Sequence, residues 1–389
     1  MVAFEANTKE AKKYIKSQQT AAEQYIGIEH DADDMSYDDD GRVEPYDVNK
    51  IRIETKGITI FQIEVWIKRG LIDLAPDFQR HIVWDHRRRS LLIESLLLRI
   101  PIPAVYVNAD ETGKKTVIDG IQRLTAIDDF IKGKYALKDL QYLSDCEGKK
   151  YSELGQRYRL RIEETLLTVN ILDERCPQMV KFDVFRRINT GGVPLNPQEI
   201  RNILAKQSVR GFLQRLAASK SFKQATDHRV VDTRMDAQEM WLRMITIFSN
   251  YDWRTADFKK FTKLYSMMDE MLLSLNEENA EVLEERETAY LRIMRQCQIV
   301  LGEQSFYKFR SKRINKQLFT AWCVVLLNVN LEEKQLIASK NKINKSYMML
   351  LQEDDDFKEA ITSSTGGRKY IKLAIDKIRE IIENSTPEV

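Results

Sequence analysis

The sequence predicts an α+β protein in which a small mixed domain is followed by an all-α helical domain. Two observations support this prediction. Between about residues 43 and 200, short β-branched runs alternate with segments whose apolar residues recur every three to four positions. After about residue 200 the strand-like runs stop, and the helical spacing continues along the rest of the chain.

We therefore expect three parts, namely an acidic, mobile leader over residues 1–42, a mixed domain over 43–200 and a helical domain over 201–389. A chain of 389 residues is long enough for more than one domain, because single hydrophobic cores stop growing at roughly 250–300 residues. The leader contains "EHDADDMSYDDD", and such acidic runs usually stay solvated. A regulatory or DNA-mimicking role for the leader stays open.

The elements of the mixed domain follow from local patterns. A strand-like "NKIRIET" leads to the helical "ITIFQIEVWIKRG", and a second helix begins after Asp85, a good N-cap, and stops before Pro101. The runs "PAVYVNA" and "KKTVID" flank the turn "DETG" and are typical of a hairpin or of adjacent strands. A helix "IQRLTAIDDFIKG", a buried strand "TLLTVNILD" and a helix "CPQMVKFDVFRRINTGG" closed by a double glycine complete the domain.

The helical domain is predicted from one capping signature and a set of periodic segments. Asn196 followed by Pro197 is typical of an N-cap and first helical position. Apolar residues then recur at helical spacing in residues 208–219, 235–249, 257–275, 279–302, 316–330 and 368–383. No repeat of fixed period is visible, so a solenoid is not supported.

Composition excludes several classes of protein. A net charge of +2 leaves no bulk polycation, so any nucleic-acid surface must be a local patch. The four cysteines form no CxxC pair and no histidine lies near them, so we expect reduced thiols and no zinc site. The N-terminus lacks the apolar region of a signal peptide, and no apolar run is long enough to span a bilayer. We therefore expect a cytoplasmic protein with no membrane partner.

The stretch "VIDGIQR" places Asp119, Gly120, Gln122 and Arg123 on a tight corner between a strand and a helix. A glycine there lets a ligand approach main-chain N–H groups, and the first turn of the following helix favours a phosphate. Arg123 adds a guanidinium fork that matches phosphate oxygens. Asp119 could bind a phosphate-bound Mg²⁺ or orient a water, and Gln122 could orient a nucleophile or read a base. In isolation, such a corner is more often a common turn whose arginine forms a surface ion pair.

Two further polar stretches accompany this corner. Gln79 and Arg80 precede an apolar triplet containing Trp84, which we expect in the core. In "FRRINTGGVPLNPQEIRN", Asn189 and Gly191 lie in a loop between two helices. The first stretch continues into the basic helix start Arg87, Arg88 and Arg89, a run that is usually solvated.

Together, "PDFQRHIVW", "LIESLLLRIPIPAVYV", "VIDGIQRLTAIDDFIKG" and "FRRINTGGVPLNPQEIR" resemble, in order and spacing, the domain-of-unknown-function family 262. This is the N-terminal domain of GmrSD-type modification-dependent restriction systems, a relative of ParB and sulfiredoxin. The resemblance covers about residues 50–205 and continues more weakly at "DTRMDAQEMWLRMITIF" and "SKRINKQLFTAW".

The resemblance implies a ParB-like nucleotide-binding domain that couples a nucleoside triphosphate to recognition of modified DNA in defence against phage. The family motif DGQQR is matched here with Ile121 in place of the first glutamine, and the ParB-type phosphate turn is matched by Gly120, Arg123 and Ala126. On this reading Asp119, Gln122 and Arg123 are the catalytic candidates for hydrolysis to the diphosphate, and Asp119 holds Mg²⁺. The candidate nucleotide contacts are Gly120, Arg123, Thr125, Gln79, Arg80, Asn189 and Gly191.

Restriction members of the family carry a histidine-based HNH nuclease domain after the helices. The histidines of this chain are His30, His81, His86 and His228, so we expect no HNH chemistry in the helical domain. Cleavage would then need a partner, such as an effector nuclease, or an unusual site in the first domain; self-association is also open.

Three functions stay open from the sequence. The first is the nucleotide-dependent switch described above. The second is a DNA-binding module without an enzymatic step, which would use Arg87, Arg88, Arg89, the "RYRLR" stretch, and Lys312 and Arg313 within "YKFRSKRINK". The third is a metal-dependent DNA nickase that uses Asp119 with Asp128 and Asp129, although the last two are better interpreted as charges on a helix surface.

Overall fold

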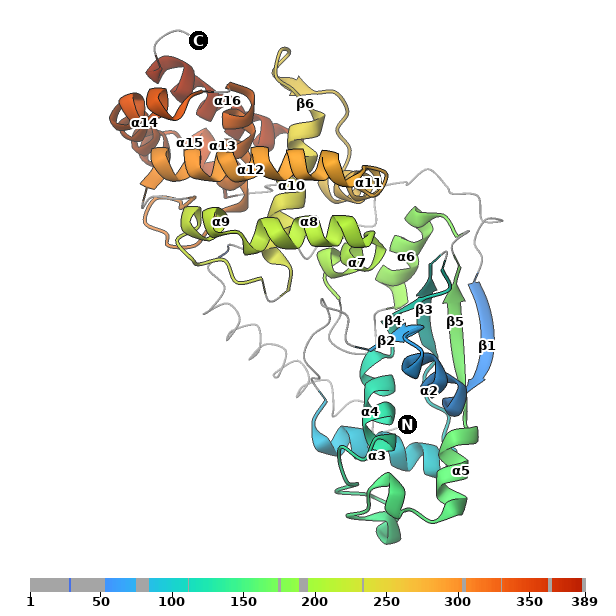
Figure 1. The fold of residues 1–389 in the computed structure, drawn as a ribbon. Coiled ribbons are helices and arrows are strands. Elements are labelled where there is room, and N and C mark those ends of the chain that lie inside the picture. The colour runs from blue at the N-terminus through green and yellow to red at the C-terminus, as the bar shows by residue number, and fades with distance from the viewer. Residues whose placement is uncertain are drawn as a thin grey trace. The chain divides into compact units, whose positions relative to one another are not determined.

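The computed structural model describes Ile28 and residues 53–74, 84–110, 112–173, 176–188, 195–232, 234–302, 306–329, 331–362 and 366–386. Its backbone contacts divide the chain into two units, of which the first is Arg42–Ile203 and the second is Leu204–Val389 together with Met1–Gly41. The predicted α+β class is confirmed, because the first unit is mixed and the second is mostly helical (Figure 1). Apart from Ile28, the acidic leader lies outside the described residues.

The first unit is built on a mixed sheet of β1 (Ile53–Thr59), β2 (Ile72–Asp73), β3 (Val105–Ala109), β4 (Lys115–Asp119) and β5 (Leu166–Leu172). Its strand order is β1-β5-β3-β4-β2. β3 and β4 pair antiparallel as a hairpin, which is one of the two predicted arrangements. β3 and β5 pair in parallel in the middle of the sheet, and β1 pairs antiparallel with β5 at one edge. The short β2, which pairs in parallel with β4, was not predicted.

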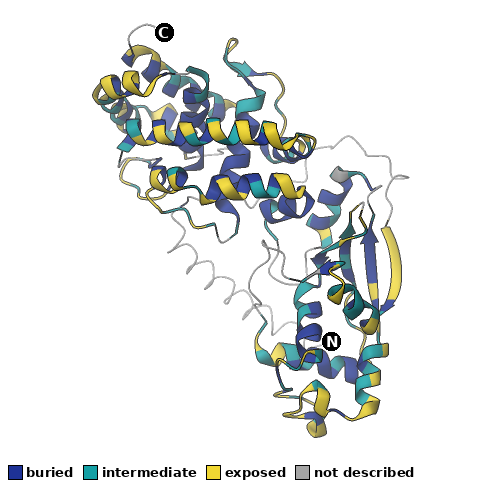
Figure 2. Ribbon diagram, viewed as in Figure 1, coloured by how far each residue is buried: buried dark blue, intermediate teal, exposed yellow. Residues whose placement is uncertain are grey.

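One face of this sheet carries the hydrophobic core. Alternate residues such as Val105, Val107 and Val169 point to that face and are buried. Trp84 packs against the core as predicted, and Figure 2 shows β5 buried and the edge strand β1 largely exposed. The helices that contribute to this core are α2 (Ile60–Lys68), α3 (His86–Leu97), α4 (Ile121–Ile131) and α5 (Gln156–Glu164).

Helix ends in this unit follow the predicted caps. The Asp85 carboxylate accepts a hydrogen bond from the Arg88 backbone N–H at 2.7 Å and begins α3, which ends shortly before Pro101. Helix α6 spans Gln178–Ile188, and α7 spans Pro197–Leu204. Before α7, the Asn196 side chain accepts from the Glu199 N–H at 2.7 Å, as the Asn-Pro signature predicted.

The second unit is organised around two buried helices, α10 (Asp236–Asn250) and α13 (Lys316–Val329), which pack against each other. A short antiparallel hairpin of β6 (Tyr251–Asp252) and β7 (Asp257–Phe258) follows α10 and adds a small strand element to this helical unit. The other helices are α8 (Gln207–Ala218), α9 (Lys220–Ala225), α11 (Leu264–Asn276), α12 (Ala280–Leu301), α14 (Glu333–Glu353), α15 (Asp355–Ala360) and α16 (Arg368–Ser385).

Three observations bear on the sequence predictions. Ile28 is buried and forms a parallel β-bridge with Ile314. All four cysteines are free and buried. Within the described part of the chain, no helix combines the length and the apolar character that crossing a membrane requires.

Candidate functional site

The corner between β4 and α4 is built on a glycine that no other residue can replace without strain. Asp119 ends β4, Gly120 has φ +101°, and α4 begins at Ile121. A Cβ at Gly120 would lie 3.0 and 3.3 Å from the two methyl carbons of Val105. Both the backbone angle and the close approach of β3 therefore require glycine here.

The first turn of α4 is not capped by a side chain. The N-cap residue is Gly120, and the N–H groups of Ile121, Gln122 and Arg123 have no hydrogen-bond partner among the described residues. By contrast, Asp85 caps α3. The start of α4 therefore combines uncapped N–H groups with the positive end of the helix dipole, which favours an anion.

Arg123 is buried, with 8 % of its surface exposed. Its Nη2 donates to Asp119 Oδ2 at 2.8 Å, and its Nη1 donates to the carbonyl oxygens of Pro103 and Ala104. The guanidinium thus joins the end of β4 to the segment that enters β3. Nη2 already pairs with the Asp119 carboxylate, so a phosphate at this edge of the guanidinium would compete with that carboxylate.

Polar atoms without a partner remain at the corner. Gln122 Oε1 is buried and has no hydrogen bond within the described part of the structure. Asp119 is partly exposed, and its Oδ1 atom makes none of the hydrogen bonds described, in contrast to Oδ2. Thr125 lies one turn further along α4 and is partly exposed. An unsatisfied buried amide oxygen costs about 1–3 kcal/mol, so a ligand or water that donates to Gln122 would stabilise the site.

The other predicted contacts are only partly described. Gln79, Arg80, Asn189 and Gly191 lie outside the described residues. Among the described side chains, no three His, Cys, Asp or Glu residues gather as the ligands of a metal ion would. A cation at Asp119 would therefore take its remaining ligands from phosphate oxygens, water or main-chain groups.

Asp128 and Asp129 were interpreted as surface charges, and this is wrong. Their side chains are buried and pair with Lys132 at 2.7 Å and Lys134 at 2.6 Å. Helical spacing alone did not show that both aspartates turn toward the body of the unit. Asp128 lies about 10 Å or more along the α4 axis from the corner, at roughly 1.5 Å per residue, so it cannot share one metal ion with Asp119.

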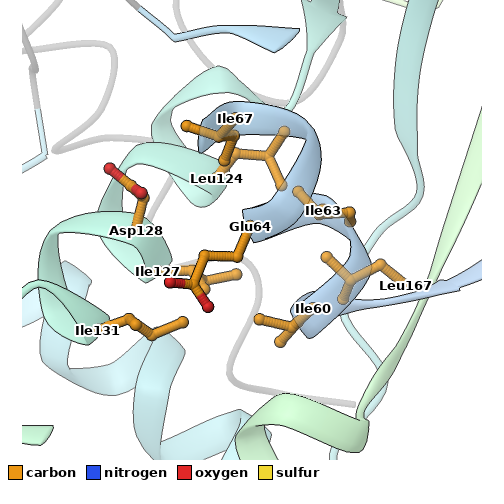
Figure 3. Close-up of a pocket in the computed structure, with 9 residues that line it drawn as sticks. All are labelled: Ile60, Ile63, Glu64, Ile67, Leu124, Ile127, Asp128, Ile131 and Leu167. Atoms are coloured by element: carbon orange, nitrogen blue, oxygen red, sulfur yellow. The ribbon is translucent and has the colours of Figure 1, made fainter. Parts of the chain in front are cut away.

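A groove lies between α2 and α4 (Figure 3). Glu64 and Asp128 are its only charged lining residues, and each pairs with a lysine one helical turn away. The lining contains no cationic side chain that could pair with a triphosphate, so this groove does not fit an anion. The remaining lining residues are Ile60, Ile63, Ile67, Leu124, Ile127, Ile131 and Leu167.

The basic helix start of α3 divides into two exposed arginines and one packed arginine. Arg87 and Arg88 are exposed, as expected for a solvated run. The Arg89 guanidinium lies 4.9 Å from the centre of the Tyr135 ring and 3.8 Å from Asp129. Arg87 and Arg88 are therefore more accessible to a nucleic acid than Arg89.

In the second unit, a basic loop connects α12 to α13. Its base is fixed by the bridge between Tyr307 and Ile314 and by the Asn315 N–H, which donates to the Phe306 carbonyl at 2.9 Å. The loop exposes an aromatic ring and three cations that form no ion pair within the described residues. These are Phe309, Arg310, Lys312 and Arg313.

Residues 63–205 match the family model described as GmrSD restriction endonuclease, N-terminal domain. The matched segment runs from α2 to the residue after α7 and includes the whole corner. The first unit is therefore an α+β domain that is similar to the N-terminal domain of GmrSD-type restriction systems, in agreement with the resemblance of its motifs. A search of curated proteins finds no match to this chain.

Two candidate residues were missed by sequence analysis. Tyr106 and Asn170 lie in the middle of β3 and β5 and were counted only as parts of strands. The available signal was a polar atom within each β-branched run. That signal does not show which strands are neighbours, so it could not connect either residue to the corner.

Proposed function

We propose that the first unit binds a nucleoside triphosphate with Mg²⁺ at the corner Asp119–Arg123 and acts as the sensor of a restriction-type defence protein. The observation that carries this proposal is the uncapped first turn of α4 behind Gly120. The match to an N-terminal domain of a restriction endonuclease supports the defence role and an interaction with DNA.

In this proposal the ligand replaces the ion pair between Asp119 and Arg123. The two groups neutralise each other at 2.8 Å. A magnesium triphosphate carries both of the charges needed to replace them, because phosphate oxygens suit the guanidinium and the cation suits the carboxylate. The ordering of Gln122 beside the terminal phosphate would then let its amide orient an attacking water for hydrolysis.

Replacement of this ion pair by the ligand is tested by titration calorimetry with each nucleoside triphosphate and with inorganic triphosphate, in the presence and absence of Mg²⁺. Wild-type protein is expected to bind only with Mg²⁺. Asp119→Asn frees Arg123, so this variant should bind metal-free triphosphate more tightly and lose its dependence on Mg²⁺. The exposed Asp145 provides the control Asp145→Asn, which should match wild type.

Absence of heat with every ligand, in wild type and in Asp119→Asn alike, would overturn the nucleotide proposal. In that case Arg123 serves only to brace β4 against the entry to β3. Thermal unfolding of each variant distinguishes a folded protein that does not bind from an unfolded one.

We infer a second role for the loop between α12 and α13, which is nucleic-acid contact. The exposed cations would neutralise phosphates, and Phe309 offers a ring on which a base can stack. Cleavage of the bound DNA would then be the task of a partner, such as an effector nuclease.

Filter binding of plain and modified duplexes at a series of salt concentrations tests this role. Lys312→Glu with Arg313→Glu should weaken binding and reduce the slope of log K against log[salt] by at least about 1–2 units, at roughly 0.9 per lost phosphate contact. Lys149→Glu with Lys150→Glu removes two exposed lysines from the first unit and serves as the matched control. Equal slopes for the two double variants would contradict the assignment.

A further inference from the structure

The face of the sheet opposite the core carries a row of polar residues that ends at the corner. Thr55 lies opposite Asn170, Asn170 opposite Tyr106, and Tyr106 opposite Asp119. Directly opposed residues share one face of a sheet, so these side chains cross β1, β5, β3 and β4 in a single line. We call Thr55, Asn170 and Tyr106 the polar row.

A shift in strand register brings Asp119 into line with the polar row. The pairing between β3 and β4 is irregular between Tyr106 and Val107, where Tyr106 pairs with Asp119 and Val107 with Val117. One extra residue, Ile118, therefore separates the two pairs, as in a β-bulge. Val117 stays on the core face with Val107, and Asp119 takes the face of Tyr106.

The polar row is ordered and still has hydrogen-bonding capacity. Thr55 Oγ1 donates to Asn170 Oδ1 at 2.7 Å, which fixes the orientation of the amide and leaves its Nδ2 group without a described partner. No hydrogen bond of the Tyr106 hydroxyl is described. On the side of the row toward the end of β3, α6 covers the face, where Lys181 Nζ donates to Asn108 Oδ1 at 2.9 Å.

We infer that the polar row binds the sugar and base of the nucleotide whose phosphates the corner holds; this inference rests on the proposed function. Asp119 belongs to both sites, so a ligand that extends from the start of α4 across Asp119 next meets Tyr106 and then Asn170. Asp119 and Asn170 lie two strand spacings apart, which is about 10 Å.

The chemistry of the polar row suits the uncharged part of a nucleotide. Thr55, Asn170 and Tyr106 are all neutral, so the row supplies no counter-charge for a phosphate. A tyrosine ring and hydroxyl, with an oriented amide donor beside it, can contact a base face and the polar edges of a base or ribose. Selectivity for a nucleoside over a bare triphosphate then resides on the sheet, and affinity for phosphate resides at the helix start.

Calorimetry that compares nucleoside triphosphates with inorganic triphosphate separates these two sites. The variants are Tyr106→Phe, Tyr106→Ala and Asn170→Ala, and the matched control is Thr168→Ala, an exposed residue of β5 outside the row. Asn170→Ala and Tyr106→Ala should weaken the affinity for the nucleoside triphosphate by about tenfold, which corresponds to roughly 1.4 kcal/mol, and leave the affinity for inorganic triphosphate unchanged. Thr168→Ala should change neither ligand.

The outcomes distinguish the two proposals. The polar row is not the nucleoside subsite if wild type binds inorganic triphosphate as tightly as every nucleotide, or if Tyr106→Ala and Asn170→Ala leave nucleotide affinity unchanged. Either result leaves the proposed phosphate site at the corner unaffected. If wild type binds neither ligand, both proposals fail. Tyr106→Phe removes only a hydroxyl, so it reports on the row even if the alanine variants do not fold; its thermal unfolding should match wild type while its nucleotide affinity falls.

Discussion

Glu239 on α10 and Lys316 on α13 form a buried ion pair in which Lys316 Nζ lies 3.2 Å from Glu239 Oε2. One turn further along α10, Arg243 Nη2 donates to Gln317 Oε1 at 2.8 Å. These residues come from "DTRMDAQEMWLR" and "RINKQLFTAW", the two stretches in which the family resemblance continues beyond the first unit. The polar residues of both stretches therefore meet in space and link the starts of the two central helices.

We expect Lys316→Met to lower the free energy of unfolding by about 3–5 kcal/mol, because it leaves the Glu239 carboxylate buried without its cation. Adding Glu239→Leu should recover part of the loss, since the pair is then replaced by apolar side chains. Urea denaturation of both single variants and the double variant measures the coupling. The exposed pair Arg368–Asp257 is the control, and Arg368→Met should cost no more than about 1 kcal/mol. Additive losses for Glu239 and Lys316 would contradict the pairing.

Gly120→Ala should destabilise the protein more than Gly133→Ala. Both glycines have a positive φ, so both substitutions strain the backbone by about 1 kcal/mol. A Cβ at Gly133 meets nothing within 4 Å, whereas a Cβ at Gly120 lies 3.0 Å from Val105. We expect an added cost of about 1–3 kcal/mol at Gly120, measured by denaturant unfolding. Val105→Ala should relieve this cost in the double variant; a Gly120→Ala loss that Val105→Ala leaves unchanged would refute the clash.

Glu94 is expected to make the first unit sensitive to acid. Burial raises the pKa of this carboxyl, but the backbone N–H groups of Tyr142, Gln141 and Leu143 donate to it at 2.7–3.1 Å and bring its pKa below the ordinary value of 4.5. A lowered folded-state pKa adds stability that is complete above the unfolded pKa and is lost as the pH falls through the folded one.

Glu94→Gln should therefore be less stable than wild type at pH 7. Below about pH 4.5, its free energy of unfolding should fall less steeply with decreasing pH than that of wild type. Thermal unfolding across this range measures the difference. Glu147 is a matched control, because its carboxylate accepts the N–H groups of Asp139 and Leu140 at 3.0 Å but is exposed. Glu147→Gln should have a smaller effect, and equal acid profiles for wild type and Glu94→Gln would argue against this role for Glu94.

Local patterns were enough to predict most elements of the first unit. The Asp85 cap, the Pro101 stop and the β3–β4 hairpin depend on neighbours in sequence, and the structure has all three. The two-residue strand β2 is too short to leave a periodic pattern. Helix α5 was seen only as the basic stretch "RYRLR", although Arg161 in fact turns inward and donates to the Leu97 carbonyl at 2.6 Å.

The candidate site was predictable only in part. The corner was visible because an Asp-Gly step separates a strand pattern from a helix pattern within a few residues. The burial of Arg123 was not visible, since its acceptors Pro103 and Ala104 lie some 20 residues earlier and become neighbours only through the β3–β4 hairpin. The polar row depends on the register of strands that are distant in sequence, together with a bulge beside Ile118, and neither can be read from one strand alone.

The three arginines at the start of α3 should differ in their effect on stability, because their contacts differ. Arg89 packs on the Tyr135 ring and neighbours Asp129, so Arg89→Ala should lower the free energy of unfolding by about 1–2 kcal/mol. Arg87 and Arg88 are exposed, so their alanine variants should stay within about 0.5 kcal/mol of wild type. If α3 contacts DNA, Arg87→Ala and Arg88→Ala should weaken binding in the salt series without a change in stability. A stability loss shared equally by the three variants would show that the distinction is wrong, because packing of one arginine and solvation of the other two cannot give the same cost.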